Sequence, residues 1–223
     1  MLNFIDDRSN ISRMQTPTVK PRRGRPPGQS RDYGDARGAL IRSGMELLTE
    51  QGFTATGLDA MLKRVNVPKG SFYHYFENKD AFGREVMRAY DAYFCAKLDR
   101  WLLDDSCSAV ERLRTFVEDA KAGMARHAFA RGCLVGNLGQ EIGALPAGYR
   151  EELAGILQGW QDRVAECLRA AQRHGELSRQ ADCDALAAFF WIGWEGAVLR
   201  ARLVRNAVPL EIFFQGFIAG LPR

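Results

Sequence analysis

The chain has 223 residues, of which 46% are hydrophobic, and its formal net charge at pH 7 is +4. This length allows one large domain or two small ones, and the apolar content suffices for a buried core. No apolar run is long enough to span a bilayer, and residues 1–7 lack a signal-peptide pattern. The five cysteines lack Cys-x-x-Cys spacing, which argues against a disulfide scaffold or zinc site and predicts a reducing, cytoplasmic setting.

Positive charge is concentrated in residues 20–31, which carry five basic side chains and no acidic one, so that the other residues sum to −1. Prolines and glycines interrupt this arm, and we expect it and the leader 1–19 to be disordered without DNA. Arg23-Gly24-Arg25-Pro26 is similar to the core of an AT-hook, whose arginines follow the negative potential of a narrow minor groove. We predict that Arg23 and Arg25 enter that groove; the alternative is a solvated tail that attracts DNA non-specifically.

Residues 36–51 predict a first helix, because apolar residues recur at near-helical spacing and Gly52 follows as a C-cap. Thr56-Gly57-Leu58-Asp59 predicts a capping box, in which the Thr56 hydroxyl and the Asp59 carboxylate satisfy free amides of a second helix at about 57–65. Pro68 ends that helix, because the residue before a proline is biased to an extended conformation.

Residues 69–75 predict a third, short helix with two different faces. Phe72 and Phe76 would anchor it in the domain. Its polar residues are Lys69, Ser71, Tyr73 and His74. Such side chains are common partners of phosphates and base edges, so the three helices indicate a helix-turn-helix with 69–75 as the recognition helix. Another helix begins at Asn78-Lys79-Asp80.

Residues 36–82 resemble the DNA-binding head of the TetR family of repressors. The shared pattern is Gly52-Phe53, a helix that begins near Thr56, the run Lys-Gly-Ser-Phe-Tyr-His-Tyr-Phe at 69–76, and Lys79-Asp80. The resemblance implies that bases or nearby phosphates are contacted by Lys69, Gly70, Ser71 and Tyr73. It implies that Thr56, His74 and Lys79 contact the DNA backbone. The alternatives are that Tyr73 is only a core aromatic residue and that His74 only caps a helix.

Past residue 78 the apolar pattern predicts helices only. They cover 78–104, 109–127, 148–174, 183–205 and about 209–220. The predicted fold is therefore all-α, with an arm at 1–31, a helix-turn-helix head at 32–80 and a helical ligand-binding and dimerisation bundle at 81–223. The TetR resemblance implies that the last two helices form the interface of a homodimer.

Residues 131–143 contain four glycines in an amphipathic segment that we expect to be helical. Each glycine costs a helix about 1 kcal/mol relative to alanine, which suits close approach or bending in a mobile pocket wall. With 191–197, the segment resembles the ligand domain of a TetR branch whose members respond to acrylate or to electrophiles. The resemblance implies a ligand site among Arg131, Cys133, Asn137, Gln140, Trp191, Trp194 and Glu195.

The carboxylate of an acrylate-like ligand would need a cation or amide donors. Candidates are Arg131, Asn137, Gln140 and Arg200. Cys133 matches the reactive cysteine of the branch, and a sensing thiol would need a lowered pKa; the alternative is an inert, buried cysteine. The tryptophans either line an apolar pocket or pack in the core, and Glu195 either pairs with an arginine or faces solvent.

These features predict a repressor that binds a palindromic operator as a dimer and is released by acrylate or a related unsaturated acid. The alternative is a redox- or electrophile-sensing repressor that acts through Cys133. An architectural DNA protein would leave the aromatic body unexplained, and Cys133 with His127 is no evidence of a catalytic dyad. We therefore expect no enzyme activity, cofactor, metal or membrane partner; the expected partners are operator DNA, an inducer and a second copy.

Overall fold

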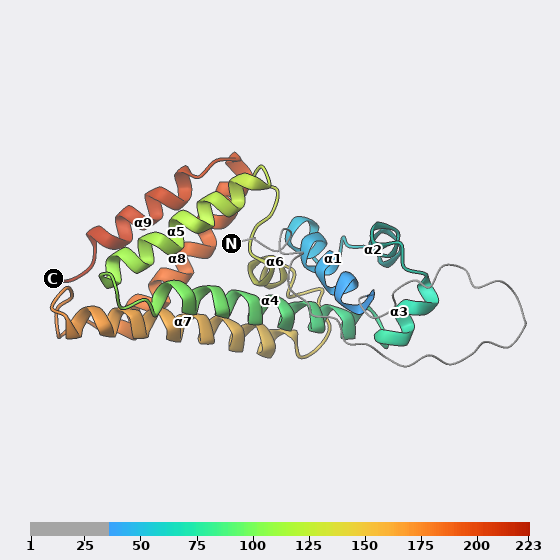
Figure 1. The fold of residues 1–223 in the computed structure, drawn as a ribbon, viewed down its shortest axis with the longest axis horizontal. Helices are drawn as coiled ribbons and strands as arrows, with labels where there is room; N and C mark the ends of the chain where they lie inside the picture. Colours follow the sequence, from blue (N-terminus) through green and yellow to red (C-terminus); the bar gives the residue numbers. More distant parts are fainter. Residues whose placement is uncertain (1–35) are drawn as a thin grey trace, which may run out of the picture.

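The computed structural model describes residues 36–223, and the predicted arm with Arg23 and Arg25 lies outside this range. Within it the chain forms nine helices and no strand, so the predicted all-α fold is confirmed (Figure 1). The helices are α1 (Ala36–Gln51), α2 (Leu58–Val65), α3 (Lys69–Tyr75), α4 (Lys79–Leu102), α5 (Ala109–Arg126), α6 (Leu134–Gln140), α7 (Tyr149–Arg173), α8 (Cys183–Val204) and α9 (Val208–Ala219). None of these helices has the length and apolarity needed to cross a membrane.

The turns that bound α1 and α3 agree with the prediction. Gly52 follows α1 with φ +82°, a left-handed conformation that glycine adopts without strain. Pro68 precedes α3 with φ −62°, and the helix begins at Lys69. Asn78 precedes α4, where its side chain accepts a hydrogen bond from the Ala81 amide at 2.8 Å.

The predicted capping box at the start of α2 is wrong. Gly57 occupies the N-cap position, and no side chain caps the helix there. The Thr56 hydroxyl instead donates to the Gly52 carbonyl oxygen at 2.5 Å. Asp59 is exposed and accepts from the Lys69 ammonium at 3.1 Å. The turn after α1 closes on itself and holds the threonine inside, so its hydroxyl does not reach the α2 amides.

Helix α4 connects the head, formed by α1 to α3, with the body. It packs against α1 at one end and against α5 and α7 further along (Figure 1). The predicted boundary at residue 80 falls in its first turn. A change in the body can therefore reach the head through one continuous helix.

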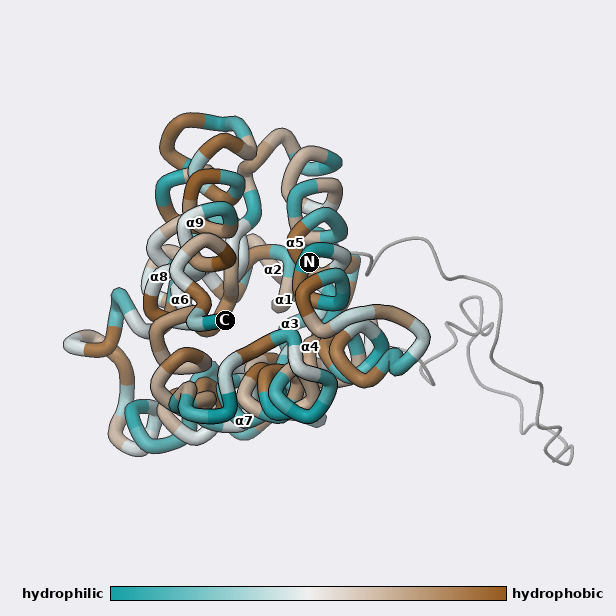
Figure 2. Tube along the Cα trace, turned by 90° about the vertical axis from the view of Figure 1, so that its left-hand side faces the viewer, coloured by the Kyte–Doolittle hydropathy of each residue, from teal (hydrophilic) through white to brown (hydrophobic). Residues whose placement is uncertain are grey.

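Aromatic residues of α4, α5, α7 and α8 form the core of the body. The Phe94 and Trp160 rings lie 4.3 Å apart between centroids, and Trp191 lies 5.3 Å from Trp160. Trp194 is fully buried, 5.2 Å from Phe116. Pairs at such separations stabilise a core beyond their area burial. Hydrophobic residues recur along α8 and α9 (Figure 2).

The glycine-rich segment 131–143 forms a shorter helix than predicted. Only Gly136 and Gly139 lie inside α6, whereas Gly132 and Gly143 lie outside it. The Cys133 sulfur caps the helix by accepting from the Gly136 amide at 3.4 Å. The loop before this cap and the turns after Gln140 confine the helix to two turns.

Candidate DNA-binding face and head–body contact

Helix α3 shows the two faces that its sequence predicts. Phe72 is fully buried and Phe76 is 3% exposed, so both anchor the helix in the head. Tyr73 is 52% exposed and is therefore not a core residue. Lys69, Gly70 and His74 are exposed, while Ser71 and Tyr75 are half-buried. A shallow hollow on α3 is lined by Gly70, Ser71, His74 and Tyr75.

Lys69 keeps its positive charge on this face. Its ammonium pairs with the Asp59 carboxylate at 3.1 Å, and the hydrogen bond from this pair raises the pKa of Lys69. Both side chains are largely exposed, so the pair is weak and easily exchanged for another anion. The ammonium of Lys69 is thus available to a phosphate.

Thr56 and Lys79 both contact the turn after α1, Thr56 from a buried position and Lys79 from a half-buried one. Thr56 is buried, and its hydroxyl donates a hydrogen bond to the Gly52 carbonyl oxygen. The Lys79 ammonium donates to the Phe53 carbonyl at 2.7 Å and lies 4.4 Å from the centre of the Phe53 ring. Burial lowers the pKa of Lys79, and the nearby Glu141 carboxylate opposes this shift. Both residues therefore order the turn after α1.

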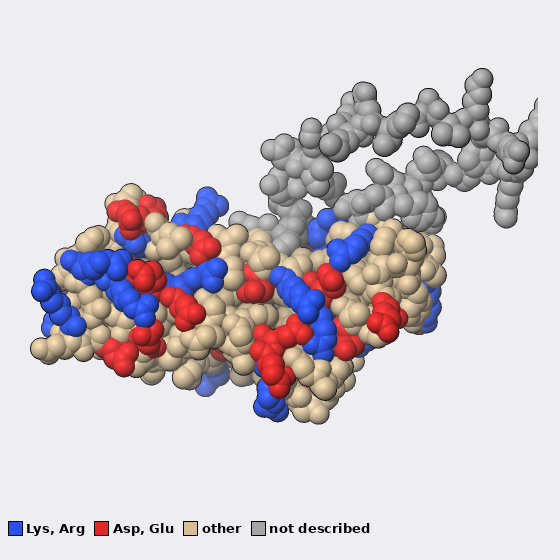
Figure 3. Space-filling model, turned by 90° about the horizontal axis from the view of Figure 1, so that it is seen from below, with Lys and Arg blue, Asp and Glu red and all other residues tan. Residues whose placement is uncertain are grey.

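Charges of both signs lie side by side over the face of the molecule shown in Figure 3. This face does not offer a continuous basic surface to DNA. Local groups such as those of α3 can still attract DNA phosphates.

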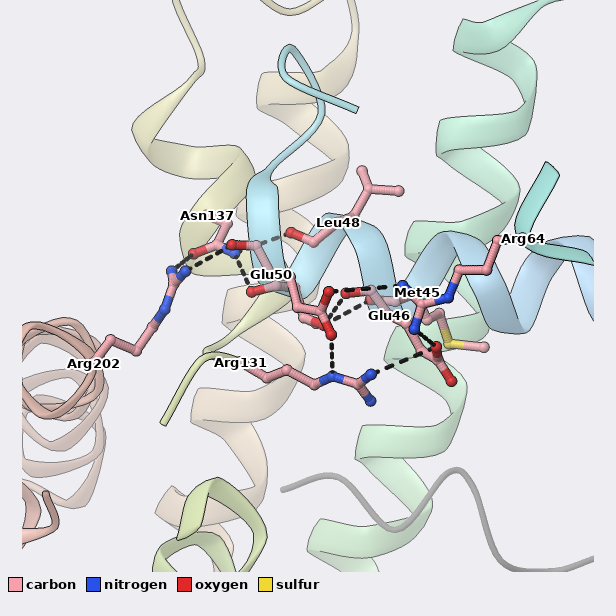
Figure 4. Close-up of polar contacts among 9 residues, drawn as sticks. Met45, Glu46, Leu48, Glu50, Arg64, Arg131, Asn137 and Arg202 are labelled. Carbon is pink, nitrogen blue, oxygen red and sulfur yellow. Dashed lines mark hydrogen bonds and ion pairs between the residues drawn. The ribbon is translucent and has the colours of Figure 1, made fainter. Parts of the chain in front are cut away.

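The carboxyl end of α1 is held by side chains of the body (Figure 4). The Asn137 amide donates to the carbonyl oxygens of Leu48 and Thr49 at 3.0 and 2.9 Å. The Arg202 guanidinium donates to the Glu50 carbonyl oxygen at 2.9 Å and to the Asn137 side-chain oxygen at 2.8 Å. The last carbonyls of a helix have no partners within it, so the body caps α1.

Arg131 forms a second link between body and head. Its buried guanidinium lies 2.7 Å from a carboxylate oxygen of Glu50 and 3.5 Å from one of Glu46. Arg64 of α2 reaches the same two carboxylates, at 2.5 Å for Glu46 and 3.7 Å for Glu50. The Glu46 and Glu50 carboxylates of α1 thus connect α2 with the body (Figure 4). Arg131 is the body residue that binds both carboxylates.

Glu141, just after α6, caps the turn that follows α1. Its carboxylate accepts from the backbone amides of Phe53 and Thr54 at 3.1 and 2.7 Å and from the Thr54 hydroxyl at 2.7 Å. A Cβ added to Gly52 would collide with this carboxylate. We call the set of links made by Arg131, Asn137, Glu141 and Arg202 the head–body contact. Sequence reasoning missed Glu141 and Arg202, because their partners lie far away along the chain.

Cys133 lies in the interior of the body, beside Tyr90 of α4 and Glu195 of α8. Burial, with the Glu195 carboxylate next, raises the pKa of the Cys133 thiol well above its usual range. Burial also raises the pKa of Glu195 to about 7. A reactive thiol needs a lowered pKa, so this conformation favours the inert, buried cysteine over a reactive one.

A small cleft between α6 and α8 brings four predicted ligand residues together. They are Cys133, Asn137, Gln140 and Glu195, and the other lining residues are Gly136, Val198, Leu199 and Arg202. Three predicted ligand residues lie elsewhere: Arg131 in the head–body contact, Trp191 and Trp194 in the core. Gln140 is exposed and donates only a long bond, 3.4 Å, to the Gly136 carbonyl.

Two family descriptions match this chain. "Bacterial regulatory proteins, tetR family" matches residues 40–86, and "Tetracyclin repressor-like, C-terminal domain" matches residues 109–217. With an exposed α3 face in a helix-turn-helix head and an all-helical body, the chain belongs to the TetR family of DNA-binding transcriptional regulators. The resemblance predicted from residues 36–82 is thereby confirmed.

The chain is also similar to individual members of this family. The chain is 55% identical over 198 residues to the transcriptional regulator AcuR of Cereibacter sphaeroides, which covers 89% of this chain and 90% of AcuR. It is 29% identical over 177 residues to the repressor NemR of Escherichia coli K12, which covers 79% and 89%. The crystal structure of a regulatory protein TetR from Rhodobacter sphaeroides matches with a TM-score of 0.82 and 53% identity, covering 84% of this chain and 99% of that one.

Proposed function

We propose that this regulator is a repressor that binds a palindromic operator as a homodimer and leaves it when a small unsaturated acid, such as acrylate, binds the body. The observation that carries the proposal is the exposed polar face of α3, with Tyr73 52% exposed above the buried Phe72. In a dimer, two such helices enter successive major grooves about 34–36 Å apart. The likeness to AcuR and to the acrylate-responsive branch supports the choice of ligand.

The contacts to DNA follow from this face. Lys69, Ser71 and Tyr73 reach bases or nearby phosphates, the backbone of Gly70 allows close approach, and His74 contacts the DNA backbone. The exposed fraction of Tyr73 and the exposed Lys69 ammonium support these roles. Thr56 and Lys79 support the turn behind the helix. Arg23 and Arg25 of the arm enter the adjacent minor groove.

The second copy docks on α8 and α9. Large apolar side chains on these helices are exposed: Phe189, Ile192, Leu199, Leu203, Val204, Val208 and Ile212. Ile192, Leu203 and Ile212 are 76%, 71% and 68% exposed, which is unusual for so many neighbouring apolar residues. A two-fold axis would bury this face against itself. The protein acts in the cytoplasm, where the operator is accessible.

An electrophile-sensing repressor acting through Cys133 is the alternative. The buried thiol with its raised pKa favours reversible ligand binding instead. Cys133→Ser removes the nucleophile and keeps a small polar group. We expect this variant to leave its operator when acrylate is added, with a modest shift of midpoint. A mass adduct on Cys133 together with loss of the response would favour the covalent route.

The proposal is tested by fluorescence anisotropy on the DNA upstream of the protein's own gene. We expect saturable binding of a dimer, no comparable binding to a shuffled sequence, and release by acrylate. Propionate, which has the same length but no double bond, is the matched ligand control. Failure to bind any upstream palindrome would refute the repressor assignment, whereas binding without release by acrylate would refute only the inducer.

A further inference from the structure

Arg202 carries a charge that no acidic residue of the described range neutralises. Its guanidinium donates to two neutral acceptors, the Asn137 side-chain oxygen at 2.8 Å and the Glu50 carbonyl at 2.9 Å. Arginine stays protonated even where burial lowers its pKa, as it does here. A carboxylate adds to such a hydrogen bond the attraction between two opposite charges, which a neutral carbonyl does not offer. A carboxylate that reached Arg202 would therefore compete with the α1 carbonyl.

The α6–α8 cleft that contains Arg202 has a second polar end at Glu195. Glu195 and Arg202 are seven residues apart on α8 and so lie about two turns apart on one face. One carboxyl oxygen of Glu195, Oε1, is buried and has no hydrogen-bond partner among residues 36–223. Between the two ends, Val198 and Leu199 give the cleft an apolar floor.

Two glycines of the segment 131–143 make room for the side chains at the two ends of this cleft. A Cβ added to Gly132 would lie 2.5 Å from the Arg202 Cδ, and one added to Gly136 would collide with the Glu195 carboxyl. Both side chains thus lie directly against glycine backbone. In this conformation the cleft has space for about one water molecule, so a small ligand can enter only when the side chains that line the cleft move.

Building on the proposed function, we propose that the α6–α8 cleft is the effector site and that the carboxylate of a small monocarboxylic acid takes Arg202 away from the Glu50 carbonyl of α1. The short carbon chain of the ligand lies over Val198 towards Glu195. Ligand and α1 then bind the same guanidinium, so the ligand favours a state in which the head–body contact is weakened. This competition supplies the differential affinity that release from the operator requires.

Proton uptake accompanies this binding. An anionic ligand disfavours a second negative charge nearby, so it binds while Glu195 is neutral. The groups that face Glu195 are the Cys133 thiol at the start of α6 and, beyond it, the Tyr90 hydroxyl of α4. Burial raises the pKa of both, so both are neutral near pH 7, and Arg202 on α8 is always charged. Glu195, with a pKa of about 7, is then the group that titrates.

Calorimetric titration of the dimer with acrylate, in buffers of different ionisation enthalpy, tests the proton step. The neutral fraction of Glu195 falls about tenfold between pH 6 and pH 8, so acrylate affinity should fall about tenfold as pH rises. Up to one proton should be taken up per site at pH 8. In Glu195→Gln, which is always neutral, affinity should not change with pH and no proton should be taken up.

The acrylate concentration at which half of the protein leaves the operator tests the role of Arg202. Arg202→Gln should weaken acrylate binding at least tenfold, and Arg202→Lys, which keeps a cation, should retain measurable binding. Arg150→Gln, at an exposed arginine near the start of α7, should behave as the wild type. If Arg202→Gln does not fold as a dimer, the pH profiles of Glu195→Gln and the wild type decide alone.

The two proposals fail in different ways. Wild-type protein that acrylate releases, with unchanged midpoints in Arg202→Gln and an unchanged pH profile in Glu195→Gln, would overturn the effector site and leave the repressor function standing. Wild-type protein that stays on its operator with acrylate at pH 6 would overturn the proposed inducer, and the effector site with it.

Discussion

At the scale of single residues, α3 shows how one step along a helix separates structure from function. Phe72 is fully buried against Phe76 and Phe82, whereas Tyr73 is 52% exposed. Successive helical residues point about 100° apart, so the neighbouring rings meet different surroundings. The centroids of the Phe72 and Tyr73 rings lie 5.4 Å apart in an edge-to-face contact. The Tyr73 ring therefore packs against Phe72, while its hydroxyl can reach DNA.

Tyr73→Ala should weaken operator binding at least tenfold and lower the free energy of unfolding by about 1 kcal/mol or less, because only an edge contact is lost. Tyr73→Phe, which removes the hydroxyl and keeps the ring, separates hydrogen bonding from stacking. Anisotropy titrations with operator DNA and urea unfolding give the two quantities. Operator affinity unchanged in Tyr73→Ala would remove Tyr73 from the DNA interface.

At the scale of elements, α6 is short but makes contacts that decide where α1 sits. Together with the residues beside it, it supplies Asn137 and Glu141 to the last turn of α1 and to the turn that follows. The backbone groups that these side chains contact are carbonyls at the end of α1, which have no partners within the helix, and amides of the turn that follows. Shifts of α6 therefore act on the orientation of the head.

Glu141→Ala should lower the free energy of unfolding by about 1–3 kcal/mol, because it leaves the amides of Phe53 and Thr54 without their acceptor. Gln140→Ala is the matched control, because Gln140 is the exposed neighbour of Glu141 and makes only one hydrogen bond, 3.4 Å long. This variant should change the free energy of unfolding by less than about 0.5 kcal/mol. Urea denaturation measures both. Equal stability of the two variants would mean that Glu141 does not hold the turn.

At the scale of the whole molecule, the apolar face of α8 and α9 and the basic arm would serve two different functions. The face would join two copies, and the arm would add affinity for DNA to each head. The two α3 helices need a fixed separation to read one operator, so the dimer and the DNA affinity are coupled.

Ile192→Glu should convert the dimer to monomers at micromolar concentration and weaken operator binding, because a charge would be buried in the centre of the joined faces. Ile192 is 76% exposed in the monomer, so the subunit should still fold. Leu103→Glu, at a leucine that is 58% exposed after α4, is the control and should remain dimeric. Light scattering after gel filtration measures the mass; a dimer for Ile192→Glu would refute this interface.

Changing Arg23 and Arg25 together to alanine should lower operator affinity and reduce the steepness of its salt dependence by about two in slope, since each phosphate neutralised contributes about 0.9. The melting temperature should not change. A control pair on the body, Arg150 and Arg179 changed to alanine, should leave the slope as it is. An identical slope in the arm variant would show that the arm does not contact DNA.

The sequence by itself determined most of the helices, the helix-turn-helix and the family. These depend on local physics: the spacing of apolar residues sets the helices, and Gly52 and Pro68 set the turns. The polar face of α3 was also predictable, because a helix seven residues long with Phe72 and Phe76 as anchors has only one way to face the head.

Only the tertiary structure decided how the head is attached to the body and what the ligand residues do. The hydrogen bond between Arg202 and Glu50 joins residues 152 positions apart in the sequence, and the one between Thr54 and Glu141 joins residues 87 positions apart. No periodicity reports such pairs, because they are set by the packing of α6 and α8 on α1. Burial likewise sets the pKa of Cys133 and Glu195, and burial is a property of the folded molecule, not of the sequence around these residues.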